Sequence, residues 1–249
     1  QVKKALSAGA KFIVSPGFNP RVVDYCLENG ISVTPGVNSP TELEMALERG
    51  LELVKFFPAE SSGGIDFLND MAAPYRGIKF FPTGGINADN VGRYLQHDRV
   101  HACGGSWMVK SDLISSGNFD EVIRLVREAV SIILGFEFVH LRINEENEEK
   151  SVAVAKDLSQ FFHFGRTSGT DFVFAGKGIE ITPQSFPGEK GCLGVGVNNL
   201  ERALAYLKRK GISIIPETAK RSQGKLKSVF IEKQIAGFAI HLLQKGKGL

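Results

Sequence analysis

A lysine between apolar residues is the first place in this sequence where a side chain could do chemistry. Lys55 lies within Leu53-Val54-Lys55-Phe56-Phe57, a run that we expect to form a buried strand. Burial disfavours the ammonium form and lowers the pKa of a lysine, so that its amine can attack a carbonyl carbon. Lys55 is therefore a candidate for forming an imine with a keto substrate. The alternative is a lysine on an edge strand whose ammonium group reaches water along the apolar surface.

Two glycine-rich turns could bind an anion. Gly84-Gly85 and Gly104-Gly105-Ser106 each follow an expected strand and precede an expected helix. Glycine lets backbone N–H groups approach a ligand closely, and helix N-termini favour negative charge. In (β/α) barrels, the loops after the last two strands often form a phosphate site. One such turn would usually serve only backbone geometry, but two of them together with Lys55 indicate a phosphorylated substrate.

The elements that must position these residues alternate between strands and helices. The expected strands are Phe12–Val14, Ile31–Pro35, Leu53–Phe57, Ile78–Pro82 and Val100–Cys103. The expected helices are Pro20–Asn29, Pro40–Arg49, Ile65–Ala72, Ala88–Gln96 and Asp120–Leu134, with N-cap residues in Asn38-Ser39-Pro40 and Asn87-Ala88-Asp89. This alternation predicts an α/β fold with a parallel sheet. Five units are too few to close an eight-stranded barrel.

A different pattern begins near Gly135. The order strand, helix, strands occurs twice in residues 135–249, which predicts a separate α+β domain with a largely antiparallel sheet. The first copy comprises a strand at Phe136–Ile143, a helix ending at Phe162, and strands at Thr170–Phe174 and Ile179–Thr182. The second comprises a strand at Leu193–Val197, a helix at Leu200–Lys210, and strands at Ile212–Pro216, Lys225–Glu232 and Gly237–Leu243.

Composition argues against several classes of function. The net charge is only +3 and the basic residues are scattered among acidic ones, so nucleic acid is not an expected partner. No apolar run approaches the roughly 20 residues that span a bilayer, so we expect no membrane partner. Cys26, Cys103 and Cys192 are too few and too far apart for a disulfide framework, which favours a reducing, cytoplasmic setting.

The strand ends of the first half resemble those of a known enzyme family. The motifs are Ser15-Pro16-Gly17, Thr34-Pro35-Gly36, Lys55-Phe56-Phe57-Pro58-Ala59-Glu60, Pro82-Thr83-Gly84-Gly85-Ile86 and Gly104-Gly105-Ser106-Trp107. In order and spacing they resemble the last five strand ends of the 2-keto-3-deoxy-6-phosphogluconate (KDPG) aldolases, which also act on 4-hydroxy-2-oxoglutarate. The resemblance covers residues 1–134 and implies a partial TIM (β/α) barrel. It also implies a class I aldolase that needs no cofactor, cleaves KDPG to pyruvate and glyceraldehyde 3-phosphate, and assembles as a homo-oligomer, a trimer.

The resemblance implies a role for each site residue by its position. Lys55 would form the imine with the C2 carbonyl of the phosphorylated 2-keto sugar acid. Pro16, Phe57 and Thr83 would line the pyruvyl pocket, although simple packing is the alternative for Pro16 and Phe57. Four residues would bind the phosphate: Gly84, Gly85, Gly105 and Ser106.

Part of the family's machinery has no counterpart here. Its general-base glutamate, and the arginine and threonine that bind the pyruvyl carboxylate, lie on three earlier strands. Glu60 matches the family's loop glutamate and not its base. The chain also opens inside an amphipathic helix at Gln1–Leu6, without an initiating Met. We therefore expect that preceding sequence or a second polypeptide supplies those strands.

The second half resembles the vicinal oxygen chelate superfamily, which includes glyoxalases, bleomycin-resistance proteins and extradiol dioxygenases. The similar segments are residues 191–200, 203–211 and 237–244. The resemblance covers residues 135–249 and implies paired βαβββ modules. It places the ligands of a divalent metal near four residues: His140, Glu180, Cys192 and His241. A glutamate is usual at the position of His241 and a histidine at that of Cys192, and some members bind no metal. Hydrogen-bonded core histidines are the alternative.

Three functions remain open from the sequence. The first is an aldolase whose missing strands are supplied elsewhere, which the retention of Lys55 and both glycine turns favours. The second is a non-catalytic role, in which the barrel remnant is structural and the C-terminal domain binds a small ligand or a metal. The third is a metalloenzyme activity of the C-terminal domain on a carbonyl metabolite.

Overall fold

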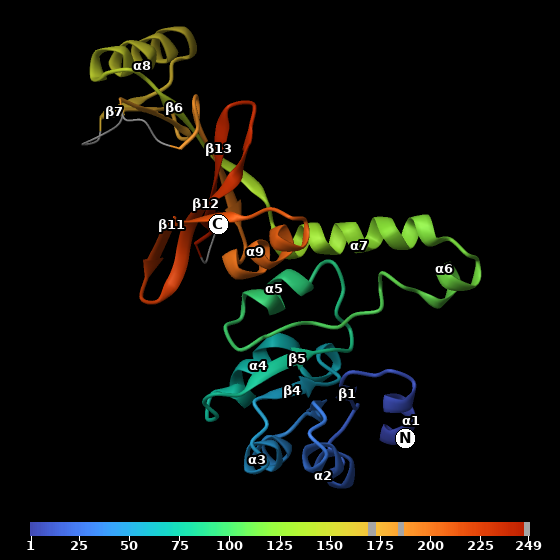
Figure 1. Ribbon diagram of the computed structural model, residues 1–249. Coiled ribbons are helices and arrows are strands. Elements are labelled where there is room, and N and C mark those ends of the chain that lie inside the picture. Colours follow the sequence, from blue (N-terminus) through green and yellow to red (C-terminus); the bar gives the residue numbers. More distant parts are fainter. Residues whose placement is uncertain (169–172, 184–186, 247–249) are drawn as a thin grey trace. The chain divides into compact units, whose positions relative to one another are not determined.

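The protein, described by a computed structural model over residues 1–168, 173–183 and 187–246, divides into two compact units. The first unit comprises residues 1–133 and the second residues 134–249 (Figure 1). Each unit has a hydrophobic core of its own. None of the described helices is long and apolar enough to cross a membrane.

The first unit is an α/β unit of short strands and helices. Its strands are β1 (Ile13–Val14), β2 (Val33–Thr34), β3 (Gly36–Val37), β4 (Leu53–Phe56) and β5 (Lys79–Pro82). Its helices are α1 (Val2–Ser7), α2 (Pro20–Glu28), α3 (Pro40–Glu48), α4 (Gly64–Ala72), α5 (Val91–Gln96), α6 (Ser111–Ser115) and α7 (Phe119–Leu134), with a 3-10 turn at Glu60–Ser62. The predicted alternation of strands and helices is confirmed.

All the strand pairs of the first unit are parallel. β1 pairs with β2, and β3, β4 and β5 form a sheet in that order. Pro35 separates β2 from β3, because proline has no N–H to donate to a ladder. The predicted strand Ile31–Pro35 therefore ends at Thr34, and it also begins later than expected, at Val33.

The prediction of a continuous strand at Val100–Cys103 is wrong. This segment meets β5 only through two isolated bridges, Phe80 with Val100 and Thr83 with Gly104. The N–H of Phe80 donates to the carbonyl of Arg99 at 2.8 Å. Pro82, two residues later, has no N–H to make the next such bond, so the ladder is interrupted between the two bridges.

Local signals explain where two of the helices begin. Ser39 caps α3 as predicted, since its hydroxyl accepts from the N–H of Glu42 at 3.3 Å while the Glu42 carboxylate accepts from the N–H of Asn38 at 2.7 Å. The helix expected from Ala88 instead begins at Val91. Asn87 is the reason, because its side chain accepts from the N–H groups of the next residues and forms a turn ahead of the helix.

The second unit contains two copies of one module. The first copy is β6 (Glu137–Asn144), α8 (Glu148–Phe162), β7 (Arg166–Ser168), β8 (Val173–Ala175) and β9 (Ile179–Thr182). The second is β10 (Gly191–Val197), α9 (Leu200–Arg209), β11 (Ile214–Ser222), β12 (Lys225–Ile235) and β13 (Phe238–Gln244). The sequence did not predict β7. The expected strand Thr170–Phe174 lies partly outside the described residues.

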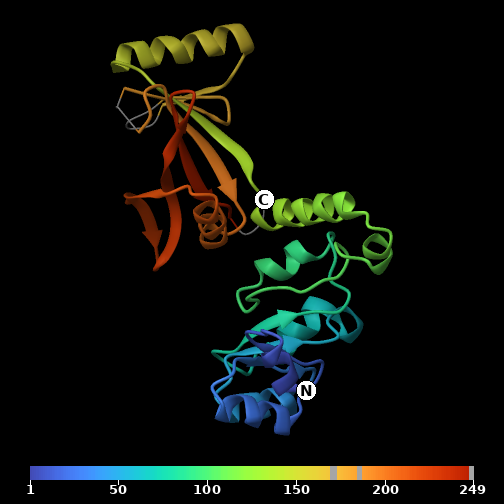
Figure 2. The ribbon, with the colours of Figure 1, turned by 45° about the vertical axis from the view of Figure 1, so that its right-hand side comes forward.

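The two modules share one eight-stranded sheet with the order β11-β12-β13-β10-β6-β9-β8-β7. Within each module the first strand lies beside the last and parallel to it, as β6 lies beside β9 and β10 beside β13. The modules join where β6 and β10 run antiparallel. In the first module, α8 lies over β8 and β9, with Ala155 packed against Val173 and Ile181 (Figure 2).

Candidate active site

Lys55 lies on an interior strand of the first unit. β4 runs between β3 and β5, and Lys55 is in register with Gly36 on one side and Phe81 on the other. The alternative of a lysine on an edge strand is therefore wrong. Its amine lies 4.4 Å from the centre of the Phe57 ring, and burial lowers the pKa of this lysine. An amine with a lowered pKa is the form needed for attack on a carbonyl.

The loop after β4 is bonded to the loop after β5. The N–H of Ala59 donates to the carbonyl of Thr83 at 2.8 Å, and the N–H of Glu60 donates to the carbonyl of Gly84 at 3.1 Å. The Phe57 ring lies so close to Gly84 that an added Cβ would be 3.2 Å from it. These contacts bring Phe57 and Thr83 together at the strand ends beside Lys55.

Thr83 presents a hydroxyl that none of the described residues satisfies. In the described part of the chain, its Oγ1 is buried and has no hydrogen-bond partner. A buried hydroxyl without a partner carries a desolvation cost of about 1–3 kcal/mol. A ligand that accepted or donated a hydrogen bond here would remove that cost.

The glycine turns expose donors, but not through helix ends. Among the described residues, the backbone N–H groups of the four predicted phosphate ligands, Gly84, Gly85, Gly105 and Ser106, have no intramolecular acceptor. Gly84 and Gly85 have φ angles of 90° and 83°, which favour glycine. The expectation that helices follow these turns directly is wrong, since α5 begins at Val91 and α6 only at Ser111. Any anion site here therefore depends on the N–H groups themselves.

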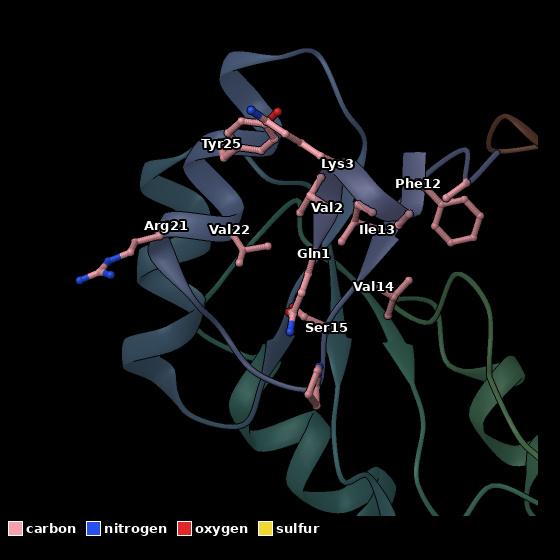
Figure 3. A pocket seen from close by; sticks show the side chains of 13 residues that line it. Gln1, Val2, Lys3, Phe12, Ile13, Val14, Ser15, Arg21, Val22 and Tyr25 are labelled. Carbon is pink, nitrogen blue, oxygen red and sulfur yellow. The ribbon is translucent and has the colours of Figure 1, made fainter. Parts of the chain in front are cut away.

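Pro16 lies at the end of β1 and touches the strand beside Lys55. A Cβ added to Gly36 would lie 2.0 Å from the carbonyl oxygen of Pro16, so the two backbones are in close contact. Pro16 also lines a pocket of about 770 Å³ between α1, β1 and α2, where Phe12, Val14 and Tyr25 are other lining residues (Figure 3). Lys55 does not line that pocket, so we do not assign the substrate to it.

A buried tyrosine holds the loop glutamate. The Tyr94 hydroxyl, on α5, donates to Oε1 of Glu60 at 2.5 Å. The Glu60 side chain in turn occupies the space beside Gly85, where an added Cβ would lie 2.6 Å from its Cβ. Sequence reasoning missed Tyr94, although its helical spacing from Val91 places both residues on the buried face. Burial and the carboxylate of Glu60 both raise the pKa of Tyr94, which keeps the hydroxyl protonated as a donor.

Replacing Tyr94 with phenylalanine should lower the free energy of unfolding of the first unit by about 2 kcal/mol, because a partly buried hydrogen bond to a charged group is lost. Tyr75→Phe is the matched control, since its hydroxyl makes a similar but exposed bond to Glu44, whose loss should cost clearly less. Urea unfolding followed by the fluorescence of Trp107, the only tryptophan, measures both. Equal losses would contradict a special role for the Tyr94–Glu60 bond.

Comparison with known proteins assigns the first unit. The family profile of the KDPG and KHG aldolases matches residues 1–125, half of the chain. The chain belongs to this family.

Named relatives agree with that assignment. A 2-dehydro-3-deoxy-phosphogluconate aldolase of Treponema pallidum is 50% identical over 133 residues, which are 53% of this chain and 63% of the relative. One from Haemophilus influenzae is 49% identical over the same shares. A solved KDPG aldolase from Zymomonas mobilis is 32% identical with a TM-score of 0.49, covering 53% of this chain and 61% of that one. The chain thus spans less than two thirds of the length of these relatives.

Outside the segment that matches the KDPG and KHG aldolases, three predicted metal-binding residues converge in the second unit. His140 lies on β6, Cys192 on β10 and His241 on β13, which are neighbouring strands. Their ligand atoms all lie within 4.8 Å of one another. Glu180, the fourth predicted residue, lies outside this group, because its carboxylate accepts two hydrogen bonds from Arg142, at 2.8 and 2.6 Å.

Burial shapes the protonation of this cluster. It lowers the pKa of His241 to about 4, and the positive charges of Arg142 and Lys220 act in the same direction. Burial also lowers the pKa of His140 and raises that of the Cys192 thiol. Both imidazoles are therefore neutral near pH 7, which is the form of histidine that binds metals.

Proposed function

We propose that this protein is a class I aldolase of the KDPG/4-hydroxy-2-oxoglutarate type, which cleaves KDPG to pyruvate and glyceraldehyde 3-phosphate. The observation that carries the proposal is the position of Lys55, on an interior strand, with its pKa lowered by burial. The names of the relatives support the same substrate class.

In the proposed reaction the Lys55 amine adds to the C2 carbonyl, and the carbinolamine takes up a proton from solvent and loses water to give a protonated imine. When the C3–C4 bond breaks, its electron pair moves toward the imine nitrogen and leaves an enamine, while the C4 hydroxyl gives up its proton and becomes the aldehyde. The enamine is then protonated at C3 and hydrolysed to pyruvate, which regenerates the amine. Pro16, Phe57 and Thr83 would surround the pyruvyl part, and the N–H groups of the two glycine turns would bind the phosphate.

The proton at the C4 hydroxyl needs a base that the described residues near Lys55 do not provide. Burial is the cause of the lowered pKa of Lys55, and no carboxylate among the described residues contributes to it. Glu60 is engaged by Tyr94. Imine formation is therefore the step that tests the proposal on this chain, and carbon–carbon cleavage is the step that also requires the expected additional strands.

Imine formation at Lys55 should persist to lower pH than at an exposed lysine. An amine reacts only when neutral, which requires a pH near or above its pKa, and burial lowers the Lys55 pKa. The measurement is the yield of pyruvate label trapped by borohydride across pH, read peptide by peptide by mass spectrometry. The exposed Lys79 on the neighbouring strand is the internal comparison. If both lysines lost their label at the same pH, burial of Lys55 would not be activating it.

For the second unit, we infer a vicinal-oxygen-chelate-like domain. The support is its topology, in which two modules each place their last strand parallel to their first and join at β6 and β10. A ligand-binding role for this domain, with a non-catalytic first unit, is the second candidate function. The convergence of His140, Cys192 and His241 favours it.

We also retain the homo-oligomer as a proposal. Its support is β1, which pairs with β2 alone among the described strands, carries the exposed side chain of Val14 and directly follows the exposed Phe12. An apolar strand edge of this kind is a surface on which further strands or another copy can pair.

A further inference from the structure

A second side-chain oxygen in the first unit is buried and has no partner. Among the described residues, no group forms a hydrogen bond with Oδ1 of Asn38, although this atom is shielded from solvent. Asn38 directly follows β3, on the side of β4 opposite to Thr83. Buried polar atoms nearly always have a partner, so each exception requires an explanation. Such an atom is a candidate for contact with a bound molecule.

The parallel register places Asn38 on the same face of the sheet as Lys55. Gly36, two residues before Asn38, is in register with Lys55, and side chains two residues apart along a strand share a face. The pairing continues beyond the end of β3, because the N–H of Phe57 donates to the carbonyl of Val37 at 3.3 Å. Asn38 therefore lies opposite Phe57, one step further along the strands than Lys55 and its neighbours.

Thr83 occupies the matching place on the other side of β4. Phe81 on β5 is in register with Lys55, and Thr83 follows it by two residues and so shares that face. Asn38 and Thr83 thus flank Phe57 in one layer of side chains. Two strand spacings separate their backbones by about 10 Å, so the two residues can contact different parts of one small substrate.

The backbone of Asn38 is held independently of its side chain. Its N–H donates to the carboxylate of Glu42 at 2.7 Å, and the Ser39 hydroxyl donates to the same oxygen at 3.0 Å. These bonds belong to the capping arrangement at the start of α3, where Ser39 and not Asn38 supplies the side-chain cap. The Asn38 oxygen therefore takes no part in starting the helix, while the backbone that carries it is fixed.

We propose that Asn38 binds the substrate: its side-chain carbonyl accepts a hydrogen bond from the hydroxyl that forms at C2 when the Lys55 amine adds there. This inference rests on the proposed aldolase function and adds a substrate contact to it. Oδ1 requires a donor, and at the pyruvyl end neither the carboxylate nor the C3 carbon supplies one. The C4 and C5 hydroxyls lie toward the phosphate, whose glycine turns follow Thr83 on the other side of β4. The C2 hydroxyl is the donor that remains.

The same contact acts in both directions of the reaction. When the nitrogen–carbon bond forms, the π electron pair of the C2 carbonyl moves to its oxygen, which takes up the proton released by the amine and becomes the hydroxyl that Asn38 binds. This hydroxyl then accepts a proton from solvent and leaves as water, which gives the protonated imine. In hydrolysis a water molecule adds to C2 and loses a proton, and the resulting hydroxyl donates to the same oxygen. Asn38 thus stabilises the carbinolamine and neither the ketone nor the imine.

Asn38→Leu should change the rate of imine formation and leave its equilibrium unchanged. The whole chain is mixed with pyruvate, and brief pulses of borohydride at increasing times report the fraction of Lys55 present as imine. We expect this fraction to rise about threefold to tenfold more slowly than in the wild type, since one hydrogen bond to the carbinolamine is lost, and to reach the same plateau. Exchange of the C2 oxygen of pyruvate with ¹⁸O-labelled water passes through the same hydroxyl and should slow by a similar factor.

Asn29→Leu is the matched control, because the Asn29 side chain is exposed and donates to the carbonyl of Tyr25 at 2.8 Å. It should match the wild type in both measurements. Wild-type rates in folded Asn38→Leu would overturn the role of Asn38, and so would a changed plateau, which would show a disturbed pocket; both results leave the aldolase proposal standing. Absence of label on Lys55 in the wild-type chain would overturn both proposals. If circular dichroism shows that Asn38→Leu does not fold, Asn38→Ala, which adds no bulk, is judged by the same criteria.

Discussion

Replacing Lys55 with alanine is expected to abolish the trapping of pyruvate on this chain by borohydride. Lys55 is the amine that lies on an interior strand beside Phe57 and Thr83, with its pKa lowered by burial. An ordinary surface lysine is protonated at neutral pH and forms imines poorly, so we expect most of the label on one peptide. Digestion and mass spectrometry of the reduced protein locate and quantify the added pyruvyl group.

Lys79→Ala is the matched control for this experiment. Lys79 belongs to the neighbouring strand β5, but it is exposed and its amine donates to the carbonyl of Asp98. The variant should keep its label on the peptide that contains Lys55. Undiminished labelling of Lys55→Ala would show that another amine forms the imine.

Replacing Gly105 with leucine should weaken the binding of a phosphorylated substrate about 10- to 100-fold and leave pyruvate labelling nearly unchanged. An added Cβ would lie 2.1 Å from the Trp107 ring and 2.9 Å from the carbonyl oxygen of Ile86, so the loop must move. Moving it displaces the N–H groups of Gly105 and Ser106. Hydrogen bonds to a charged group contribute about 1.5–3 kcal/mol each, and 1.4 kcal/mol is a factor of ten in affinity.

Calorimetric titration with KDPG, beside pyruvate labelling, separates the two effects. Gly17→Ala is the control, because a Cβ there meets nothing within 4 Å and its backbone is not in the left-handed region. We expect this variant to bind as the wild type does. Parallel losses of KDPG and pyruvate binding in Gly105→Leu would argue that the loop supports the fold and not a phosphate.

The elements that the sequence predicted well are those with strong local signals. The apolar run around Lys55 and the capping residues of α3 determine the backbone conformation within a few residues of themselves. β4 and α3 therefore begin and end close to the expected positions. Val100–Cys103 was predicted by the same apolarity. Its pairing, however, depends on Pro82 in another segment, and no property of residues 100–103 reveals that interruption.

Contacts between residues far apart in the sequence were harder to predict than the positions of individual strands and helices. The strand pattern placed His140 and His241 on strands and Cys192 directly before one, but their convergence depends on the register of three strands around Gly194. The resemblance to the vicinal oxygen chelate superfamily grouped Glu180 with them. Glu180 is in direct register with Arg142 across β6 and β9, where the two side chains form an ion pair. The bond between Tyr94 and Glu60 joins residues 34 apart, which no local pattern records.

The two hydrogen bonds that join Ala59 to Thr83 and Glu60 to Gly84 have a consequence for selectivity. They join the strand end that carries Lys55 and the first glycine turn into one unit, so that the two loops do not move independently. A substrate held by its phosphate at one end then presents its carbonyl at a fixed distance from the amine at the other. We expect this fixed distance to select sugar acids by chain length. A sugar acid one carbon longer or shorter would bind through its phosphate, but its carbonyl would not reach the Lys55 amine.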